Sequence, residues 1–257
     1  MRAFFTWLMC LIVAAIALQL FFVARIALMA VIDPQSTAFQ RSEAWQIATR
    51  GRSNGDASGS RAGDRAWQQR WVPYAQISDT LKRAVIASED GEFIYHQGVE
   101  WEAIERARQR NAKAEEIAAR RAAAAIARGK SPQTAKLRGG STITQQLAKN
   151  LFLSGERTLL RKGQELMLAT VLETLLSKQR ILELYLNSVE WGEGVFGAEA
   201  ASQRYFSKSA SRLSATEAAR LAVMLPSPKF FERRPGSAYI SGRAATIVAR
   251  MPSADVP

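Results

Sequence analysis

An uncharged apolar run near the N-terminus limits what this chain can fold into more than any other feature. From Ala3 to Ala24 it reads AFFTWLMCLIVAAIALQLFFVA, in which Thr6 and Gln19 are the clearly polar members. A helix of this length spans roughly 33 Å, which is enough to cross a hydrocarbon core of about 30 Å. A cleavable signal peptide would have a shorter apolar region that ends in a small-x-small site, and no such site is found here. The sequence therefore predicts a retained transmembrane anchor at residues 1–32.

The expected orientation of the anchor follows from a weaker signal. Arg2 and Arg25 stand on opposite sides of the span, so the charge asymmetry is small. The short N-terminal tail favours a cytoplasmic N-terminus, with the chain after Asp33 on the other side of the membrane. Cys10 lies within the span, where we expect it to act as a small hydrophobic residue.

Composition restricts the chemistry of the remaining chain. The 257 residues include one Cys and one His, which excludes an internal disulfide and a zinc site built from the usual thiolate and imidazole ligands. Catalysis would therefore depend mainly on carboxylates, lysine, arginine and hydroxyl groups. The formal net charge of +12 predicts a polyanionic partner, which could be nucleic acid, an anionic membrane surface or a phosphate-bearing substrate.

The region after the anchor divides into a linker, a domain and a tail. Residues 33–66 are expected to form a juxtamembrane linker, because the stretch GRSNGDASGSRAG at 51–63 is rich in glycine and serine and has no apolar period. A folded domain is predicted at residues 67–250, and residues 251–257 form a short C-terminal tail.

Within the domain the apolar pattern is mainly helical. Long periodic stretches at 159–176 and 213–225 indicate helices, and strands are expected only in short pieces such as Trp71–Tyr74. The segment 101–138 is rich in alanine and arginine. Two interpretations of this segment stay open, namely a solvated helix or a basic surface beside anionic lipid headgroups.

The first cluster with chemical potential is ASEDGEFIYHQG, at residues 87–98. Glu89 ends a series of apolar residues spaced four apart, which places it at the end of a buried helical stripe. A carboxylate beside apolar surface is partly desolvated, so its pKa rises and it can act as a general base. The alternative is a helix-end loop whose acidic groups bind Lys82 or Arg83, and the spacing favours neither. His96 is interpreted as a packed, hydrogen-bonded histidine.

The second cluster is GGSTITQQLAKN, at residues 139–150. The two glycines precede a helix start, for which Ser141 is the expected N-cap. Free amides at a helix start attract anions, but the lysine of a nucleotide-binding phosphate loop is missing, which disfavours ATP and GTP. Ser141, Gln145 and Lys149 fall four residues apart and would present hydroxyl, amide and ammonium groups to a polar ligand. The ordinary polar face of an amphipathic helix explains the same pattern.

The third cluster comprises Arg157, Arg161 and Glu165, again at four-residue steps. A surface ion pair between Arg161 and Glu165 would contribute only about 0.3 to 0.5 kcal/mol and would need no functional explanation. The alternative is that the two guanidinium groups bind a diphosphate, which they match in charge and in geometry. Spacing alone does not decide between the two.

Five sequence blocks in a fixed order are more specific than any single cluster. They read ASEDGEFIYHQG, GGSTITQQLAKNLFL, RKGQELMLATVLE, KQRILELYLNSVEWGEGVFGAEAASQRYFSK and LSATEAARLAVMLPSP. Over roughly residues 67–250 this order resembles the bacterial peptidoglycan glycosyltransferases, glycosyltransferase family 51. The Ser-x-x-Lys and Lys-Thr-Gly signatures of penicillin-binding transpeptidases do not occur in the sequence. The resemblance is therefore to the monofunctional, membrane-anchored form, without transpeptidase activity.

The resemblance implies a mainly α fold and a specific reaction. The expected fold is a lysozyme-like helical head with a smaller hydrophobic jaw that dips into the membrane, and residues 101–138 are expected to be an insertion or part of the jaw. The implied activity is polymerisation of lipid II into β-1,4-linked glycan strands in cell wall biosynthesis. The anomeric carbon would be inverted and undecaprenyl diphosphate released.

The resemblance also assigns roles to single residues. Glu89 matches the general base, and Glu165 matches a second essential carboxylate that positions cations, substrate or a divalent metal. The groups expected to stabilise the diphosphate are Lys149, Arg157 and Arg161. Asp90 would orient the loop or assist the base, and the residues expected to bind sugar or phosphate oxygens are Ser141, Gln145 and Asn150.

Cofactor, partners and location are likewise implied by the family. A divalent metal, Mg²⁺ or Mn²⁺, is expected from the resemblance alone, because no carboxylate spacing here is diagnostic of a metal site. The implied partners are lipid II, the growing glycan strand and the membrane, with cell-wall synthesis or division proteins as further candidates and no nucleic acid. The protein would cross the bacterial cytoplasmic membrane once, with its catalytic domain outside the cytoplasm.

Three features depart from the family pattern. Glu100 stands where the family usually has Asp, so its role is in doubt. Gln164 stands where many members have a Lys, and it cannot contribute charge to the diphosphate site. The stretch 102–138 is longer than family members usually have at this point.

Two rival functions remain at this stage. A lytic transglycosylase or lysozyme-like hydrolase also uses a catalytic Glu, but it must protonate a poor sugar leaving group and has no evident need for Lys149 with Arg157. A non-enzymatic, membrane-anchored protein that binds polyanions would also explain the net charge. In that case, scattered neutralisation of Arg or Lys would matter more than Glu89.

Overall fold

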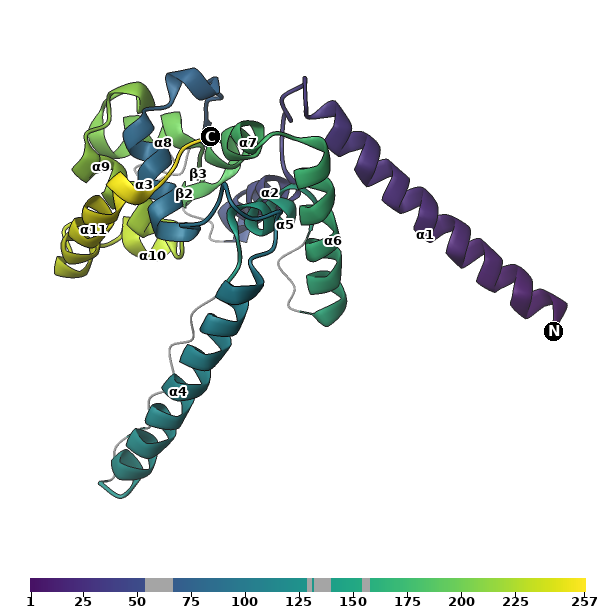
Figure 1. The fold of residues 1–257 in the computed structure, drawn as a ribbon, viewed down its shortest axis with the longest axis horizontal. Helices are drawn as coiled ribbons and strands as arrows, with labels where there is room; N and C mark the ends of the chain where they lie inside the picture. Colours follow the sequence, from purple (N-terminus) through teal and green to yellow (C-terminus); the bar gives the residue numbers. More distant parts are fainter. Residues whose placement is uncertain (54–66, 129–130, 132–139, 154–157) are drawn as a thin grey trace.

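The computed structural model describes residues 1–53, 67–128, 131, 140–153 and 158–257, and it is mainly helical, as the sequence predicts (Figure 1). The described α-helices are α1 Arg2–Leu28, α2 Ala38–Ser53, α3 Asp79–Glu89, α4 Trp101–Ile126, α5 Ile143–Phe152, α6 Leu159–Leu175, α7 Lys178–Ser188, α8 Ala198–Phe206, α9 Ala215–Met224, α10 Pro228–Glu232 and α11 Ala238–Arg250. The strands are β1 Gln68–Gln69, β2 Glu190–Gly192 and β3 Val195–Phe196, and the 3₁₀ turns are η2 Tyr74–Gln76, η3 Ala210–Arg212 and η4 Met251–Ser253.

Side-chain caps explain where most of these helices begin. A Ser or Thr hydroxyl accepts a hydrogen bond from a backbone amide of the first turn in α3, α5, α6, α7, α9 and α11. The cap of α5 is Thr142, so the prediction that Ser141 caps this helix is wrong. Thr142 Oγ1 accepts from the amide of Gln145 at 3.1 Å, whereas Ser141 Oγ accepts from Lys162 Nζ at 3.3 Å.

The hydrophobic core surrounds the packing of α3 against α9 and α11. Leu81 and Val85 of α3 are fully buried, which confirms the predicted stripe that leads to Glu89. Trp191 is also fully buried, and its indole N–H donates to the carbonyl of Leu221 at 3.0 Å. This core fixes the C-terminal end of α3, where the candidate base lies.

A small sheet of strand order β1-β3-β2 lies beside this core. The prediction of a strand at Trp71–Tyr74 is wrong. The side chain of Asn187 hydrogen-bonds both backbone groups of Val72, which are then unavailable to a neighbouring strand. Asn187 Oδ1 accepts from the Val72 amide at 2.9 Å and its Nδ2 donates to the Val72 carbonyl at 3.0 Å. Pro73 then offers no N–H, so this segment cannot pair with a strand.

Helix α1 confirms the predicted apolar helix, since it is long and apolar enough to cross a membrane. Its C-terminal third packs against the body of the molecule, where Ile26 and Met29 are buried. Phe22 lies 5.3 Å from the ring of Phe152 in α5. Figure 1 shows α1 running past α6 and extending away from the domain.

Helix α2 lies inside the segment that was expected to be a linker. Thr37 and Gln40 exchange hydrogen bonds at its start, with the Thr37 amide 2.8 Å from Gln40 Oε1 and the Gln40 amide 3.0 Å from Thr37 Oγ1. Glu43 forms an ion pair with Lys229, which joins α2 to α10. These tertiary contacts hold a helix that the composition of the segment does not reveal, and residues 54–66 of the predicted linker lie outside the described residues.

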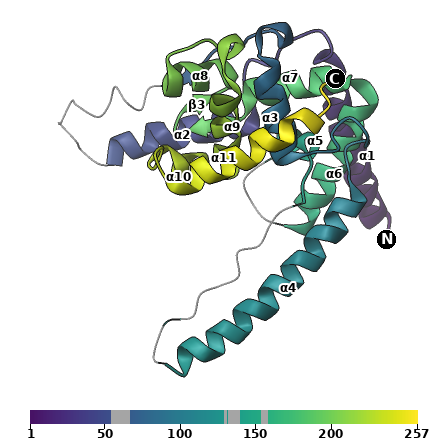
Figure 2. The same cartoon turned by 60° about the vertical axis from the view of Figure 1, so that its left-hand side comes forward.

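Helix α4 projects from the body in both views (Figures 1 and 2). Its charged side chains are exposed, and pairs such as Arg106–Glu102 and Arg120–Glu116 lie one turn apart on its surface. The interpretation of a solvated helix is therefore confirmed for Trp101–Ile126. Contact with anionic lipid stays a hypothesis, and residues 129–130 and 132–139 of this predicted segment lie outside the described residues.

Candidate active site

Glu89 is the last residue of α3 and is half-buried. Its Oε2 accepts a hydrogen bond from Gln146 Nε2 at 3.0 Å, and its Oε1 lies 3.3 Å from Ser88 Oγ. Gln146 is itself oriented, because its Oε1 accepts from the hydroxyl of the buried Tyr185 at 2.9 Å. Burial raises the pKa of Glu89, and the hydrogen bond from Gln146 opposes that rise by stabilising the carboxylate. The carboxylate is thus held in place and made more basic.

The alternative explanation of the acidic loop fails. Lys82 Nζ binds Asp79 at 3.0 Å, one turn back on α3. Arg83 donates to the carbonyl of Ala254. Neither basic residue is therefore the partner of Glu89, and the interpretation as a helix-end ion pair is wrong.

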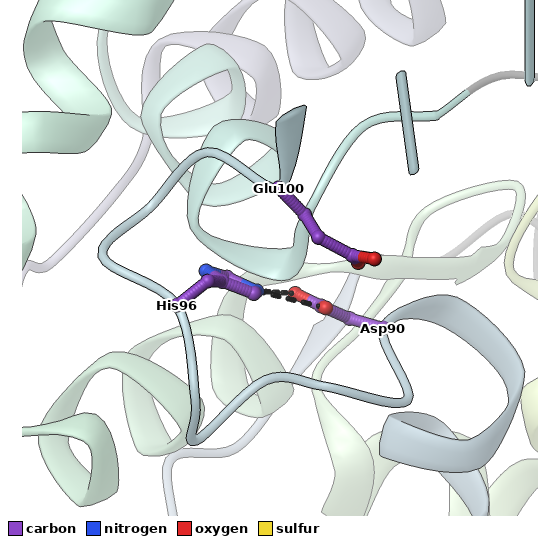
Figure 3. A group of neighbouring side chains, drawn as sticks. All are labelled: Asp90, His96 and Glu100. Carbon is purple, nitrogen blue, oxygen red and sulfur yellow. Dashed lines mark hydrogen bonds and ion pairs between the residues drawn. The ribbon is translucent and has the colours of Figure 1, made fainter. Parts of the chain in front are cut away.

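Asp90 and His96 close the loop that follows Glu89 (Figure 3). His96 Nε2 lies 2.9 and 3.0 Å from the two carboxylate oxygens of Asp90. The Nδ1 atom of the same ring accepts from the Gly98 amide at 3.1 Å. A neutral ring whose Nδ1 accepts must carry its proton on Nε2, so Nε2 donates to Asp90. His96 is therefore packed and hydrogen-bonded, as predicted.

Asp90, His96 and Glu100 also lie close enough together to be compared with a metal site, since one ligand atom from each falls within 4.8 Å of the others. Their hydrogen bonds argue against that use. Nε2 is a protonated donor, Asp90 also accepts from the Ile143 amide at 2.9 Å, and Glu100 is paired with Arg106. Because Mg²⁺ and Mn²⁺ need available oxygen ligands, this group does not fit a divalent-metal centre.

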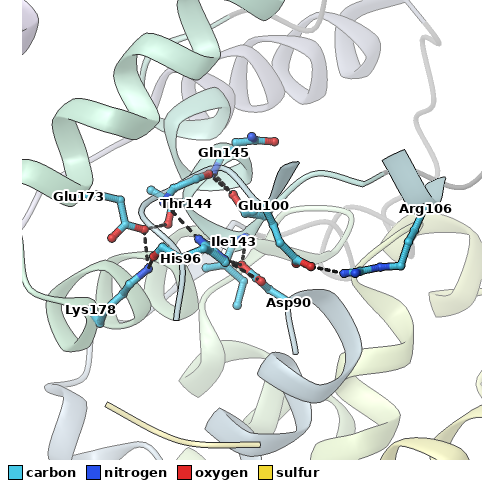
Figure 4. A network of polar contacts seen from close by, with 11 residues as sticks. Asp90, His96, Glu100, Arg106, Ile143, Thr144, Gln145, Glu173 and Lys178 are labelled. Atoms are coloured by element: carbon cyan, nitrogen blue, oxygen red, sulfur yellow. Dashed lines mark hydrogen bonds and ion pairs between the residues drawn. The ribbon is translucent and has the colours of Figure 1, made fainter. Parts of the chain in front are cut away.

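A further polar network fastens the same loop to α5, α6 and α7 (Figure 4). Glu173 Oε1 accepts from Thr144 Oγ1 at 2.6 Å and from Lys178 Nζ at 2.8 Å, and Lys178 also donates to the carbonyl of His96. Gly98 has a φ of +83°, and a Cβ there would lie 3.0 Å from Glu173 Cγ. The loop can therefore approach α6 this closely only with glycine at position 98.

The second half of the site is a cationic cluster, by which we mean Arg161, Lys162 and Glu165 of α6. Arg161 Nη1 lies 3.0 Å from Glu165 Oε2, and Lys162 Nζ is paired with Glu165 Oε1. Glu165 is only 3% exposed, so this is not the surface ion pair considered from sequence. Lys162 also donates to Ser141 Oγ at 3.3 Å and to Gln145 Oε1 at 3.4 Å. The start of α5 and the start of α6 thus meet at Lys162.

Two donors, one in the cationic cluster and one next to it, have no hydrogen-bond partner among the described residues. These are Gln145 Nε2 and Arg161 Nε, both buried, among the residues that the structure describes. A buried donor without an acceptor is costly, and such groups call for an explanation such as a bound ligand. Oxygen atoms of a phosphate or a sugar are acceptors of the kind that these two groups require.

The remaining predicted site residues lie in different surroundings, and one of them is not placed by the structure. Lys149 is exposed on α5, one turn after Gln145, and Asn150 is buried on the same helix. Arg157 lies outside the described residues, so the structure does not place it. Asp90 is 5% exposed with both oxygens hydrogen-bonded, which makes it part of the support for the loop.

Two side chains of the candidate site, Gln146 and Lys162, are not among the residues predicted from the sequence. A four-residue step from Ser141 selects Gln145, although the sequence has two adjacent glutamines at 145 and 146. Lys162 directly follows Arg161, and the four-residue step from Arg157 to Glu165 selects Arg161 instead. The signal in the sequence is that each site residue selected by spacing has a neighbour of the same chemical type, as in Gln145–Gln146 and Arg161–Lys162.

Comparison with known proteins gives one consistent result. The model of the transglycosylase family matches residues 56–252. A biosynthetic peptidoglycan transglycosylase of Paraburkholderia xenovorans is 48% identical over 95% of this chain and 90% of the relative. Proteins of the same description from Bordetella pertussis and Herminiimonas arsenicoxydans are 46% and 43% identical over 97% and 100% of this chain, and over 93% and 99% of their own lengths. With its five ordered blocks, its mainly helical fold and these full-length relatives, the chain belongs to the transglycosylase family.

Proposed function

We propose that this protein is a peptidoglycan glycosyltransferase that polymerises lipid II into β-1,4-linked glycan strands and releases undecaprenyl diphosphate. One observation supports this most directly. Two neighbouring residues of α5 contact the two halves of the site, because Gln146 binds Glu89 and Gln145 binds Lys162. The same turn of α5 therefore contacts both a base and a cationic cluster, and transfer from a sugar diphosphate requires these two groups near one reaction centre.

In this proposal Glu89 is the general base. Its carboxylate accepts the proton of the acceptor sugar's 4-hydroxyl while that oxygen attacks the anomeric carbon of the donor. The new C–O bond forms on one face as the bond to the diphosphate breaks on the other, so the anomeric carbon is inverted. Burial raises the pKa of Glu89, which makes its carboxylate a stronger proton acceptor.

The cationic cluster supports departure of the leaving group. The electron pair of the broken bond goes to a diphosphate oxygen, and Arg161 and Lys162 stabilise the charge that develops there. Lys149 and Arg157 are assigned to the same diphosphate, and Glu165 holds the two cations of α6 in place. Because a diphosphate stabilised in this way leaves without a proton, no general acid is required, which favours a transferase over a lysozyme-like hydrolase.

The remaining polar residues are assigned to binding and support. Ser141, Gln145 and Asn150 are proposed to contact sugar or phosphate oxygens, while Asp90 orients the loop that carries the base. We assign no step to a divalent metal. The carboxylate of Glu165 already pairs with Arg161 and Lys162, and the group of Asp90, His96 and Glu100 does not fit a metal site.

The apolar helix α1 is consistent with a membrane anchor. We propose that the N-terminus is cytoplasmic and that the catalytic domain lies outside the cytoplasm, where lipid II would be polymerised. Cell-wall synthesis or division proteins are candidate partners, and nucleic acid is not expected because the basic excess is assigned to diphosphate and membrane.

The test is glycan-strand formation from labelled lipid II by the full-length protein in detergent. Glu89→Gln is compared with Glu92→Gln, the same substitution at an exposed position three residues away. We expect polymer from wild type and Glu92→Gln, and none from Glu89→Gln, with all three folded by circular dichroism. Cleavage of preformed glycan would instead identify a hydrolase. A folded wild type that is inactive where another family member works would favour a polyanion-binding protein.

A further inference from the structure

Gln19 of the anchor helix and Gln164 of α6 form a reciprocal amide pair. Gln19 Nε2 donates to Gln164 Oε1 at 3.3 Å, and Gln164 Nε2 donates to Gln19 Oε1 at 3.1 Å. Gln19 is one of two clearly polar side chains in the apolar span, so its presence there is costly unless its amide is satisfied. The pair satisfies both amides and joins residues that are 145 positions apart in the sequence.

Neighbouring contacts fix the position of α1 along the domain. The ring of Phe22 packs against Phe152, and the buried Ile26 continues the same face of α1 toward Met29, the buried residue that follows the helix. At the end of this face Arg180 Nε donates to the carbonyl of Met29 at 2.7 Å. Gln19 therefore lies beside the first half of α6 and Met29 beside the residues that follow α6, so the two helices run in the same direction.

This arrangement brings the anchor to the cationic cluster. Gln164 directly precedes Glu165 and lies within one turn of Arg161. Leu159 and Leu160, in the first turn of α6, are 93% and 87% exposed. Exposed leucines in the turn that also carries Arg161 and Lys162 suit the boundary of a bilayer.

We propose that Gln19 and Gln164 are positioning residues, which lock the anchor to α6 and hold the cationic cluster at the depth of the diphosphate of a membrane-embedded donor. This inference rests on the proposed function of the cluster. It also explains the departure at position 164, where an amide pairs with the anchor in place of a cation. If α1 were only a tether, any apolar helix would serve and the amide pair would be dispensable.

The experiment compares two donors in one preparation of proteoliposomes. One donor is long-chain lipid II in the bilayer, and the other is a short-chain, water-soluble analogue whose diphosphate is not held at a fixed depth. The variants are Gln19→Leu, Gln164→Leu, the double variant, and Gln164→Asn, which shortens the amide without adding an apolar group. Thr6→Val and Thr170→Val are matched controls, since their hydroxyls are exposed and bond only to the backbone of their own helices.

We expect each glutamine variant to lose about three- to twentyfold in kcat/KM with the long-chain donor, and less than twofold with the soluble donor. The double variant should be no worse than either single variant, because the pair acts as one unit. Equal losses with both donors would mean a general structural role and would overturn the proposal. Activity equal to the threonine controls would overturn it as well, while an inactive wild type would refute the proposed function instead.

Discussion

Replacing Gln146 by Leu tests how the candidate base is held. The substitution removes the 3.0 Å hydrogen bond to Glu89 and also leaves the hydroxyl of Tyr185 without its acceptor. A hydrogen bond to a charged group contributes about 1.5 to 3 kcal/mol, and about 1.4 kcal/mol corresponds to a tenfold change in rate. If that bond positions the carboxylate for proton transfer, kcat/KM should fall roughly ten- to hundredfold.

The same variant should also shift the pH dependence of activity, in a direction that follows from the pKa of Glu89. The hydrogen bond from Gln146 lowers the pKa of Glu89 because it stabilises the charged form. Its loss raises that pKa further, and a general base works only when it is deprotonated. The acidic limb of the kcat/KM profile should therefore move to higher pH in the variant.

The assay is polymerisation of labelled lipid II across a pH series, with Gln109→Leu as the matched control. Gln109 is exposed on α4, where its amide bonds to Glu105 one turn away. The control should keep the wild-type rate and the wild-type limb. A folded Gln146→Leu protein with unchanged activity, or with an acidic limb moved to lower pH, would refute the assignment of Gln146 and weaken that of Glu89.

Four further outcomes are expected. Lys149→Ala should lower turnover at least tenfold and change the melting temperature little, because Lys149 is exposed; an unfolded variant would make the residue structural. Gly98→Ala should destabilise the protein by about 1 to 3 kcal/mol in thermal unfolding, since a Cβ at φ +83° would lie 3.1 Å from the backbone of α6. Asn187→Leu should cost about 2 to 5 kcal/mol by the same measurement, because it leaves both backbone groups of Val72 buried without partners. Burial raises the pKa of Glu190 from 4.5 to about 7, so the stability that this group contributes is present below pH 4.5 and lost as the pH rises toward 7. Glu190→Gln should remove this part of the pH dependence of the melting temperature, and an unchanged profile would contradict the cause given.

Some features of the site were predictable because they depend only on residues close together in the sequence. The apolar stripe of α3 ends at Glu89, and a single helical period is enough to place that carboxylate beside the core. The hydrogen-bonded state of His96 was also predicted, although its partner Asp90 was not. By contrast, the N-cap of α5 is Thr142 and not the predicted Ser141, whose hydroxyl accepts a hydrogen bond from Lys162 of another helix.

The amino-acid sequence alone determined the long apolar helix near the N-terminus, the mainly helical fold and the family, since these follow from composition, period and the order of five blocks. Only the tertiary structure decided which side chains meet. Gln146 reaches Glu89 across 57 residues, and Gln164 reaches Gln19 across 145. Helical period specifies which residues share a face, but not which face of another helix they contact. That choice is made by how α1, α3, α5 and α6 pack together, so the amide contacts on which the proposed site depends could not be read from spacing.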